Sequence, residues 1–168
     1  MGLFDMFKQD QGDQMTPHLA FVTSLIYMMA SDGKIDNEEV GQLLAVLGGE
    51  EQADGSIGVG AQNRELLRKA QQIVRSTPIN QFLQQAAPLL GDSQKMCILT
   101  NLVDSLLSDG SADPAEQQLF GVFLQAFGVP EQRFRPFFEV ITLKNDRTVF
   151  TNNNHPNNQP GFQVKLSV

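Results

Sequence analysis

The sequence predicts an all-α fold: a single-domain helical bundle in which a helix–Asp-Gly turn–helix hairpin occurs twice with pseudo-twofold symmetry. Apolar residues recur at helical spacing along much of the 168-residue chain, which is long enough for one core. The pattern S-D-G-x-x-D-x-x-E occurs at residues 31–39 and again at 108–116, with its glycines, Gly33 and Gly110, 77 residues apart (110 − 33). Internal repetition of this kind indicates two similar structural units.

The first predicted helix spans residues 17–29. Thr16 is a capping residue and Pro17 fits the first helical position. The residues that follow are apolar nearly all round the helix, so we expect it to be central and buried. Gly33 is predicted to end this segment in a left-handed cap, and Asp36 to cap the next helix.

Three segments complete the first half. The helix after Asp36 ends at Gly48-Gly49, and residues 48–60, rich in glycine and acid, are predicted to be a flexible loop. Apolar residues between 66 and 74 mark an amphipathic helix. Thr77-Pro78 then opens another helix, which ends at Gly91.

The second half follows the same signals. Its predicted caps and stops are, in chain order, Asp92 or Ser93, Gly110, Asp113-Pro114 and Gly128. The outgoing helix of the second copy is therefore about one turn longer than that of the first. A final helix is predicted over residues 134–141, where Pro136 should split or kink it.

We divide the chain into an N-terminal arm (1–14), a helical domain (15–144) and an asparagine-rich C-terminal tail (145–168). The alternation of apolar and polar residues over 162–168 is a strand pattern, and residues 148–150 are its only evident partner. Two alternatives remain open for the tail: a small β-hairpin, or an irregular, disordered segment.

The chain carries a formal net charge of −7 and a single cysteine. The negative charge disfavours a nucleic-acid partner, because such binding depends on cations that neutralise phosphates. Cys97 lies in an apolar run, which predicts a buried thiol in a reducing compartment. We find no signal-peptide pattern and no apolar run of membrane-spanning length, and therefore expect a cytoplasmic protein.

Helix capping explains part of the repeated S-D-G-x-x-D-x-x-E pattern, whose two copies, residues 31–39 and 108–116, we call the acidic phrases. Asp36 and Asp113 stand at the predicted N-cap positions, and Glu39 and Glu116 follow three residues later, which is the capping-box arrangement. The glycine supplies the positive φ that ends the incoming helix. No ligand is needed to account for these residues.

Capping does not explain Asp32 and Asp109. An acid at the end of a helix meets the negative end of the helix dipole, which is unfavourable. Three acids on one turn would repel one another unless a cation were present, and carboxylates suit Ca²⁺ or Mg²⁺. The first and third EF-hand positions would fall on Met28 and Ala30, which cannot ligate, so we reject a true EF-hand. Capping alone, and capping with weak cation binding, both remain open.

The two hairpins, at Leu25–Leu47 and Leu99–Gly128, resemble those of the TerB family, the tellurite-resistance domains related to the N-terminal domain of the DjlA co-chaperone. The resemblance covers about residues 15–142, and Met1–Lys8 is also similar to the start of that family. The loop at 48–60 and the segment after residue 145 depart from the family pattern.

The resemblance implies an all-α pseudo-twofold bundle with an acidic, metal-binding surface. It also implies a cytoplasmic location, peripheral at the inner membrane face, and a role in stress-response assemblies with an integral membrane protein as partner. Carried over by position, the metal site falls on Asp32, Asp36, Glu39, Asp109, Asp113 and Glu116.

The sequence leaves two other classes of function to consider besides a cation-binding scaffold. In the first, the protein is a co-chaperone-like interaction module without a metal role, and a partner docks on an apolar groove or on the N-terminal arm. The second is an enzyme. His18 and His155 have no nucleophile partner in the sequence, and carboxylates on exposed helix starts do not acquire a raised pKa. We therefore expect no catalytic activity and surface positions for both histidines.

Overall fold

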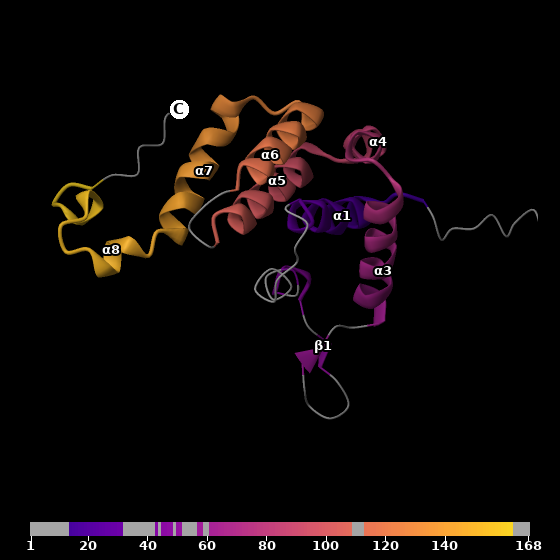
Figure 1. Ribbon diagram of the computed structural model, residues 1–168, viewed down its shortest axis with the longest axis horizontal. Coiled ribbons are helices and arrows are strands. Elements are labelled where there is room, and N and C mark those ends of the chain that lie inside the picture. Colours follow the sequence, from indigo (N-terminus) through magenta and orange to yellow (C-terminus); the bar gives the residue numbers. More distant parts are fainter. Residues whose placement is uncertain are drawn as a thin grey trace, which may run out of the picture.

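The computed structural model describes residues 14–31, 43, 45–48, 50–51, 57–58, 61–108 and 113–162, and confirms an all-α bundle (Figure 1). Its helices are, in chain order, α1 (Pro17–Met29), α3 (Ala61–Ser76), α4 (Ile79–Ala86), α5 (Asp92–Leu106), α6 (Pro114–Phe127), α7 (Glu131–Asn145) and α8 (Thr148–Thr151). Residues 43 and 45–47 are also helical. The predicted caps at Gly33, Asp36 and Gly110 lie outside the described residues.

Helix α1 lies at the centre of the bundle, as predicted. Nine of its thirteen residues are buried, and it contacts α3, α4, α5 and α6. Thr16 caps the helix, because its Oγ1 accepts a hydrogen bond from Leu19 N at 3.1 Å, and Pro17 takes the first position. A helix that is apolar on nearly every side is stable only where neighbours cover it, and α1 has neighbours on all of these sides.

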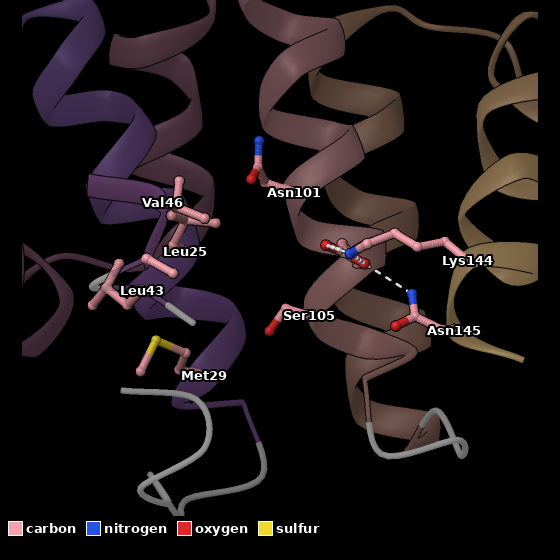
Figure 2. A pocket seen from close by; sticks show the side chains of 10 residues that line it. Leu25, Met29, Leu43, Val46, Asn101, Ser105, Lys144 and Asn145 are labelled. Atoms are coloured by element: carbon pink, nitrogen blue, oxygen red, sulfur yellow. Dashed lines mark hydrogen bonds and ion pairs between the residues drawn. The ribbon is translucent and has the colours of Figure 1, made fainter. Parts of the chain in front are cut away.

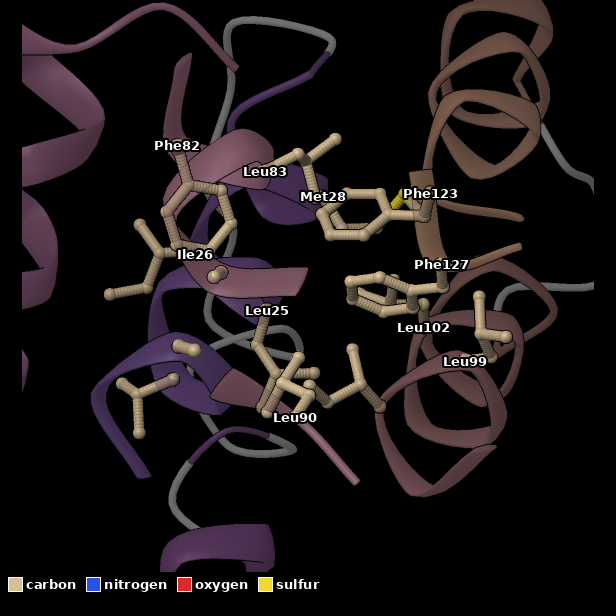
Figure 3. Packing of buried hydrophobic residues seen from close by; sticks show 14 of the residues in the cluster. Leu25, Ile26, Met28, Phe82, Leu83, Leu90, Leu99, Leu102, Phe123 and Phe127 are labelled. Carbon is tan, nitrogen blue, oxygen red and sulfur yellow. The ribbon is translucent and has the colours of Figure 1, made fainter. Parts of the chain in front are cut away.

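Aromatic side chains from α4 and α6 pack around α1 (Figure 3). Phe82 of α4 and Phe123 of α6 are fully buried, and the ring centroids of Phe123 and Phe127 lie 5.7 Å apart. They belong to the same buried cluster as Met28 of α1 and Leu102 of α5. Burial of each large apolar side chain contributes about 1.5–3 kcal/mol. Both halves of the chain therefore share one core.

Helices α1 and α5 end in the same way, 77 residues apart (106 − 29). The residue after each helix has φ −86° and ψ 0° at Ala30, and φ −98° and ψ 0° at Leu107. Each of these residues donates its N–H to the carbonyl four residues earlier, at 3.0 Å. The next N–H donates three residues back, at 3.1 Å from Ser31 and 3.2 Å from Ser108. The sequence repeat is thus a repeat of backbone structure up to the start of each acidic phrase.

Each repeat also includes a third helix. Tyr27 and Asp104 hold equivalent positions, again 77 residues apart (104 − 27). The Tyr27 hydroxyl donates to the carbonyl of Thr77, directly after α3. Asp104 accepts hydrogen bonds from Lys144 and Asn145, the last two residues of α7. The repeating unit is therefore a helical hairpin with a third helix, α3 or α7, tied to the last turn of its first helix.

Two ion pairs hold α7 along α5. Near the start of both helices, Arg133 Nη2 lies 2.5 Å from Asp92 Oδ2, and near their ends Lys144 Nζ lies 2.5 Å from Asp104 Oδ2. The partners are separated by 41 and 40 residues (133 − 92 and 144 − 104). Because this separation is almost constant, the two helices run side by side in the same direction.

The N-cap predicted for α5 is wrong, and one of the two alternatives predicted for Pro136 of α7 does not occur. The N-cap of α5 is Gly91 rather than Asp92 or Ser93, because the Gln94 side chain reaches back and accepts a hydrogen bond from Gly91 N at 2.8 Å. Pro136 lies inside α7, so the predicted split does not occur, and the alternative of a kink stays a prediction. Ion pairs to α5 lie on both sides of the proline, at Arg133 and Lys144.

The loop and the tail also differ from expectation. The segment 48–60 was predicted to be a flexible loop. Near its two ends, β1 (Glu50–Glu51) pairs antiparallel with β2 (Ile57–Gly58), so these residues form regular secondary structure. Residues 148–150 belong to the short helix α8 and not to a strand. Asp146 Oδ1 accepts hydrogen bonds from both the N–H, at 3.0 Å, and the hydroxyl of Thr148, which favours a turn at this point. The other predicted strand is 162–168, of which residues 163–168 are outside the described part.

Candidate functional site

The second acidic turn is described where α6 begins. Asp113 is the N-cap, and its Oδ1 accepts a hydrogen bond from Ala115 N at 2.7 Å. Glu116 reaches back, so that its Oε2 accepts from Asp113 N at 3.0 Å. The predicted capping box is confirmed. At the other end of α6, the helix stops at Gly128 as predicted, and this glycine adopts φ 64° in the left-handed region.

Capping leaves room for a second role at this turn. The Asp113 carboxylate accepts from the backbone N–H groups of Ala115 and Glu116 in the cap, whereas an ionised carboxylate has about four lone-pair sites. Asp113 is exposed and Glu116 is half-buried. Their chemistry is that of hard-cation ligands, which are carboxylate oxygens.

The other four predicted ligands are Asp32, Asp36, Glu39 and Asp109, and all of them lie outside the described residues. The convergence of three acids on each turn therefore stays a prediction. Within the described part of the chain, no group of three His, Cys, Asp or Glu side chains is placed to hold a metal ion.

The described ends of the two phrases face a common groove. Ser31, the first residue of the first phrase, and Ala115, within the second, both line it. Its other walls come from Tyr27, from the α3–α4 junction around Thr77, and from Leu119 of α6. The bundle therefore brings the first turn, where it leaves α1, to the same side as the start of α6.

A separate cavity of about 230 Å³ lies between α1 and α5 (Figure 2). One wall is apolar and the other is polar. The apolar wall is formed by Leu25, Met29, Leu43, Ala45 and Val46, and the polar wall by Asn101, Asp104, Ser105, Lys144 and Asn145. Sequence reasoning missed this cavity, because the partners of Asp104 lie about forty residues away and no local pattern joins them.

The family-model comparison matches the description "Tellurite resistance protein TerB" over residues 18–137, well over half of the chain. The chain belongs to the TerB family. This agrees with the resemblance carried by the two hairpins, and the matched stretch runs from α1 into α7. Searches among curated proteins and among solved structures gave no match.

The matched TerB stretch ends within α7, so α8 and the turns after it lie beyond it. For the part of this TerB protein that is described, no helix is both long and apolar enough to cross a bilayer. The predicted acids from Asp32 to Glu116 all fall within the matched residues.

Cys97 of the TerB domain is exposed, and the prediction of a buried thiol is wrong. Helix α5 turns Ile98 and Leu99 toward the core, whereas Cys97 points away beside Asn101, whose Nδ2 donates to Cys97 O at 2.8 Å. Apolar neighbours in the sequence were misleading, because adjacent residues of a helix point in different directions.

The two histidines have different surroundings. His18 is exposed, as expected, but the His155 side chain is only 15% exposed. Its Nδ1 accepts a hydrogen bond from Asn157 N at 3.1 Å, and its Nε2 lies 3.2 Å from Asp146 Oδ2. The hydrogen bond from the Thr148 hydroxyl holds the pKa of Asp146 below its usual value, and the nearby His155 acts in the same direction. These contacts give His155 a structural role in the turn after α8.

Proposed function

We propose that this TerB protein is a non-catalytic, cation-responsive scaffold in tellurite resistance or a related stress response. Its two acidic turns bind Ca²⁺ or Mg²⁺ weakly, with water completing the coordination. The loaded scaffold holds a protein partner, an integral membrane protein, at the cytoplasmic face of the inner membrane. The family match supports the tellurite-resistance setting.

The observation that carries the proposal is the common groove of the two phrases. Ser31 and Ala115 line the same groove, and α1 and α5 end with the same hydrogen bonds. The acids that directly follow Ser31 and Ser108 in the sequence are those that capping does not require. A bound cation would offset the repulsion of an acid from the negative end of the helix dipole.

A calorimetric or NMR titration with Ca²⁺ and Mg²⁺ tests the proposal. We expect saturable binding at millimolar cation that is lost when Asp32→Asn and Asp109→Asn are combined. The matched control is Asp92→Asn, which removes a carboxylate that pairs with Arg133 at the start of α5. Binding that is absent, or that survives the double substitution, would leave the acids with capping roles alone.

A second candidate is a protein-interaction module without a metal role. A groove continues from Tyr27 along α4 and α6 as far as Pro88 and Ala126, since two adjoining depressions share Val122. Its surface is mostly apolar, which suits a docked partner. Partner binding that persists in EDTA but is lost with Val122→Lys, or on deletion of residues 1–8, would favour this candidate over the cation scaffold.

A further inference from the structure

The cavity between α1 and α5 has walls of opposite character. In Figure 2, Leu25, Met29 and Val46 lie on one side, and Ser105 and Lys144 on the other. Asp104 stands on the polar side with its charge balanced by Lys144, at 2.5 and 2.7 Å from the two carboxylate oxygens. The side chains of Asp104 and Lys144 are 38% and 62% exposed, so a small molecule in the cavity can reach both.

The fold does not require a charged pair such as Asp104 and Lys144 to link α5 to α7. The equivalent position in the first repeat is Tyr27, which ties α1 to the end of α3 through a neutral hydroxyl and the Thr77 carbonyl. Helix α7 is also tied to α5 by a second ion pair, Asp92 with Arg133. The charged pair therefore distinguishes the two repeats at a position where a neutral contact serves the same structural purpose.

The geometry points to a binding site for a free apolar α-amino acid in this cavity. The polar wall carries one positive and one negative group side by side, so a ligand with a single charge would face one like charge. A zwitterion gives each group a partner, its ammonium beside Asp104 and its carboxylate beside Lys144. The site uses none of the residues of the acidic turns, so it goes beyond the proposed cation scaffold.

The remaining donors and the size fit such a ligand. A lysine ammonium has three donors, and Lys144 uses two of them on Asp104. A cavity of about 150 Å³ accommodates benzene, so a volume of about 230 Å³ has room for a somewhat larger molecule. This corresponds to an amino acid the size of leucine or methionine, with its side chain against Leu25, Met29 and Val46.

Titration of the full-length protein with L-leucine, followed by the methyl NMR signal of Met29, tests the site. The signal is assigned with Met29→Leu. We expect a saturable shift, and dissociation constants at least about tenfold higher for 4-methylpentanoate, which lacks the ammonium, and for 3-methylbutylamine, which lacks the carboxylate. Absence of a saturable shift, or equal affinity for leucine and either analogue, would overturn the proposal.

Three variants separate ligand binding from helix packing. Asp104→Asn should weaken leucine binding at least about tenfold. Asp92→Asn removes the other α5–α7 ion pair, away from the cavity, and should leave leucine affinity unchanged. Ala45→Phe fills the cavity from an exposed position and should abolish binding without disturbing the core. Retained binding in Ala45→Phe, or equal losses in Asp104→Asn and Asp92→Asn, would also contradict the proposal.

Discussion

Asp113 and Glu116 form hydrogen bonds within one turn at the start of α6, whereas Asp104 binds side chains about forty residues away along the chain. The Asp113–Glu116 capping box could be predicted because both partners lie within one turn and their spacing is diagnostic. The role of Asp104 could not, since its partners come from the far end of α7. Cys97 is exposed although its neighbours in the sequence are apolar. Burial of a helical residue depends on the direction of its side chain more than on the composition of its segment.

Removal of the Asp113 side chain tests the cap directly. We expect Asp113→Ala to lower the free energy of unfolding by about 0.5–2 kcal/mol, because Ala115 N loses its hydrogen-bond acceptor. Asp113→Asn keeps an acceptor and should cost much less. Urea unfolding of both variants measures the difference, and an equal loss in the two would assign the effect to charge instead of capping.

At the scale of elements, some predicted helix starts and stops are confirmed, whereas α5 is capped by Gly91 and α4, predicted to end at Gly91, ends at Ala86. Thr16 and Gly128 act as predicted. Other contacts accompany the departures from prediction: α7 continues through Pro136 and is paired with α5 near both of its ends, and Asp146 accepts hydrogen bonds from Thr148 in a turn. Helices α3 and α7 were both predicted, but their equivalence as the third helix of each repeat was not, because they share no sequence pattern.

The ion pair between α5 and α7 should make stability depend on pH. The Arg133 hydrogen bond and charge lower the pKa of Asp92 in the folded protein. A carboxyl group with a depressed folded pKa stabilises above its unfolded value, about 3.9, and this contribution is lost as the pH falls through the folded value. The urea midpoints of wild type and Asp92→Asn should therefore converge as the pH falls below about 4.

Arg133→Gln serves as the matched control, because it removes the cause of the pKa shift and leaves the carboxyl in place. Its acid slope should be shallower than that of the wild type, like that of Asp92→Asn. Parallel curves for all three proteins would show that the pair does not couple protonation to folding.

At the scale of the whole molecule, the duplication and the all-α class could be read from the sequence, because both depend on periodicity and repetition. Which residues form the common core depends on how the two units meet. Phe82 and Phe123 come from α4 and α6, and both are fully buried around α1. No property of either segment alone shows that they share a core.

Two phenylalanine truncations compare the core with the surface. Phe123→Ala should lower the free energy of unfolding by about 3–5 kcal/mol, because it leaves a cavity where both units meet. Phe150 is 88% exposed, and Phe150→Ala should change stability by less than about 0.5 kcal/mol. Chemical denaturation measures both, and similar losses would contradict the placement of Phe123 in the core.

The contact between α1 and α5 has a consequence for how this molecule could have been assembled in evolution. Each of these helices hides its apolar surface partly behind the other. In solenoid arrays, repeats can be added or lost one at a time, since each only stacks on its neighbour. Here the two units bury apolar surface against each other. A chain with only one unit would therefore expose part of its hydrophobic core, and two such chains would be soluble only as a dimer.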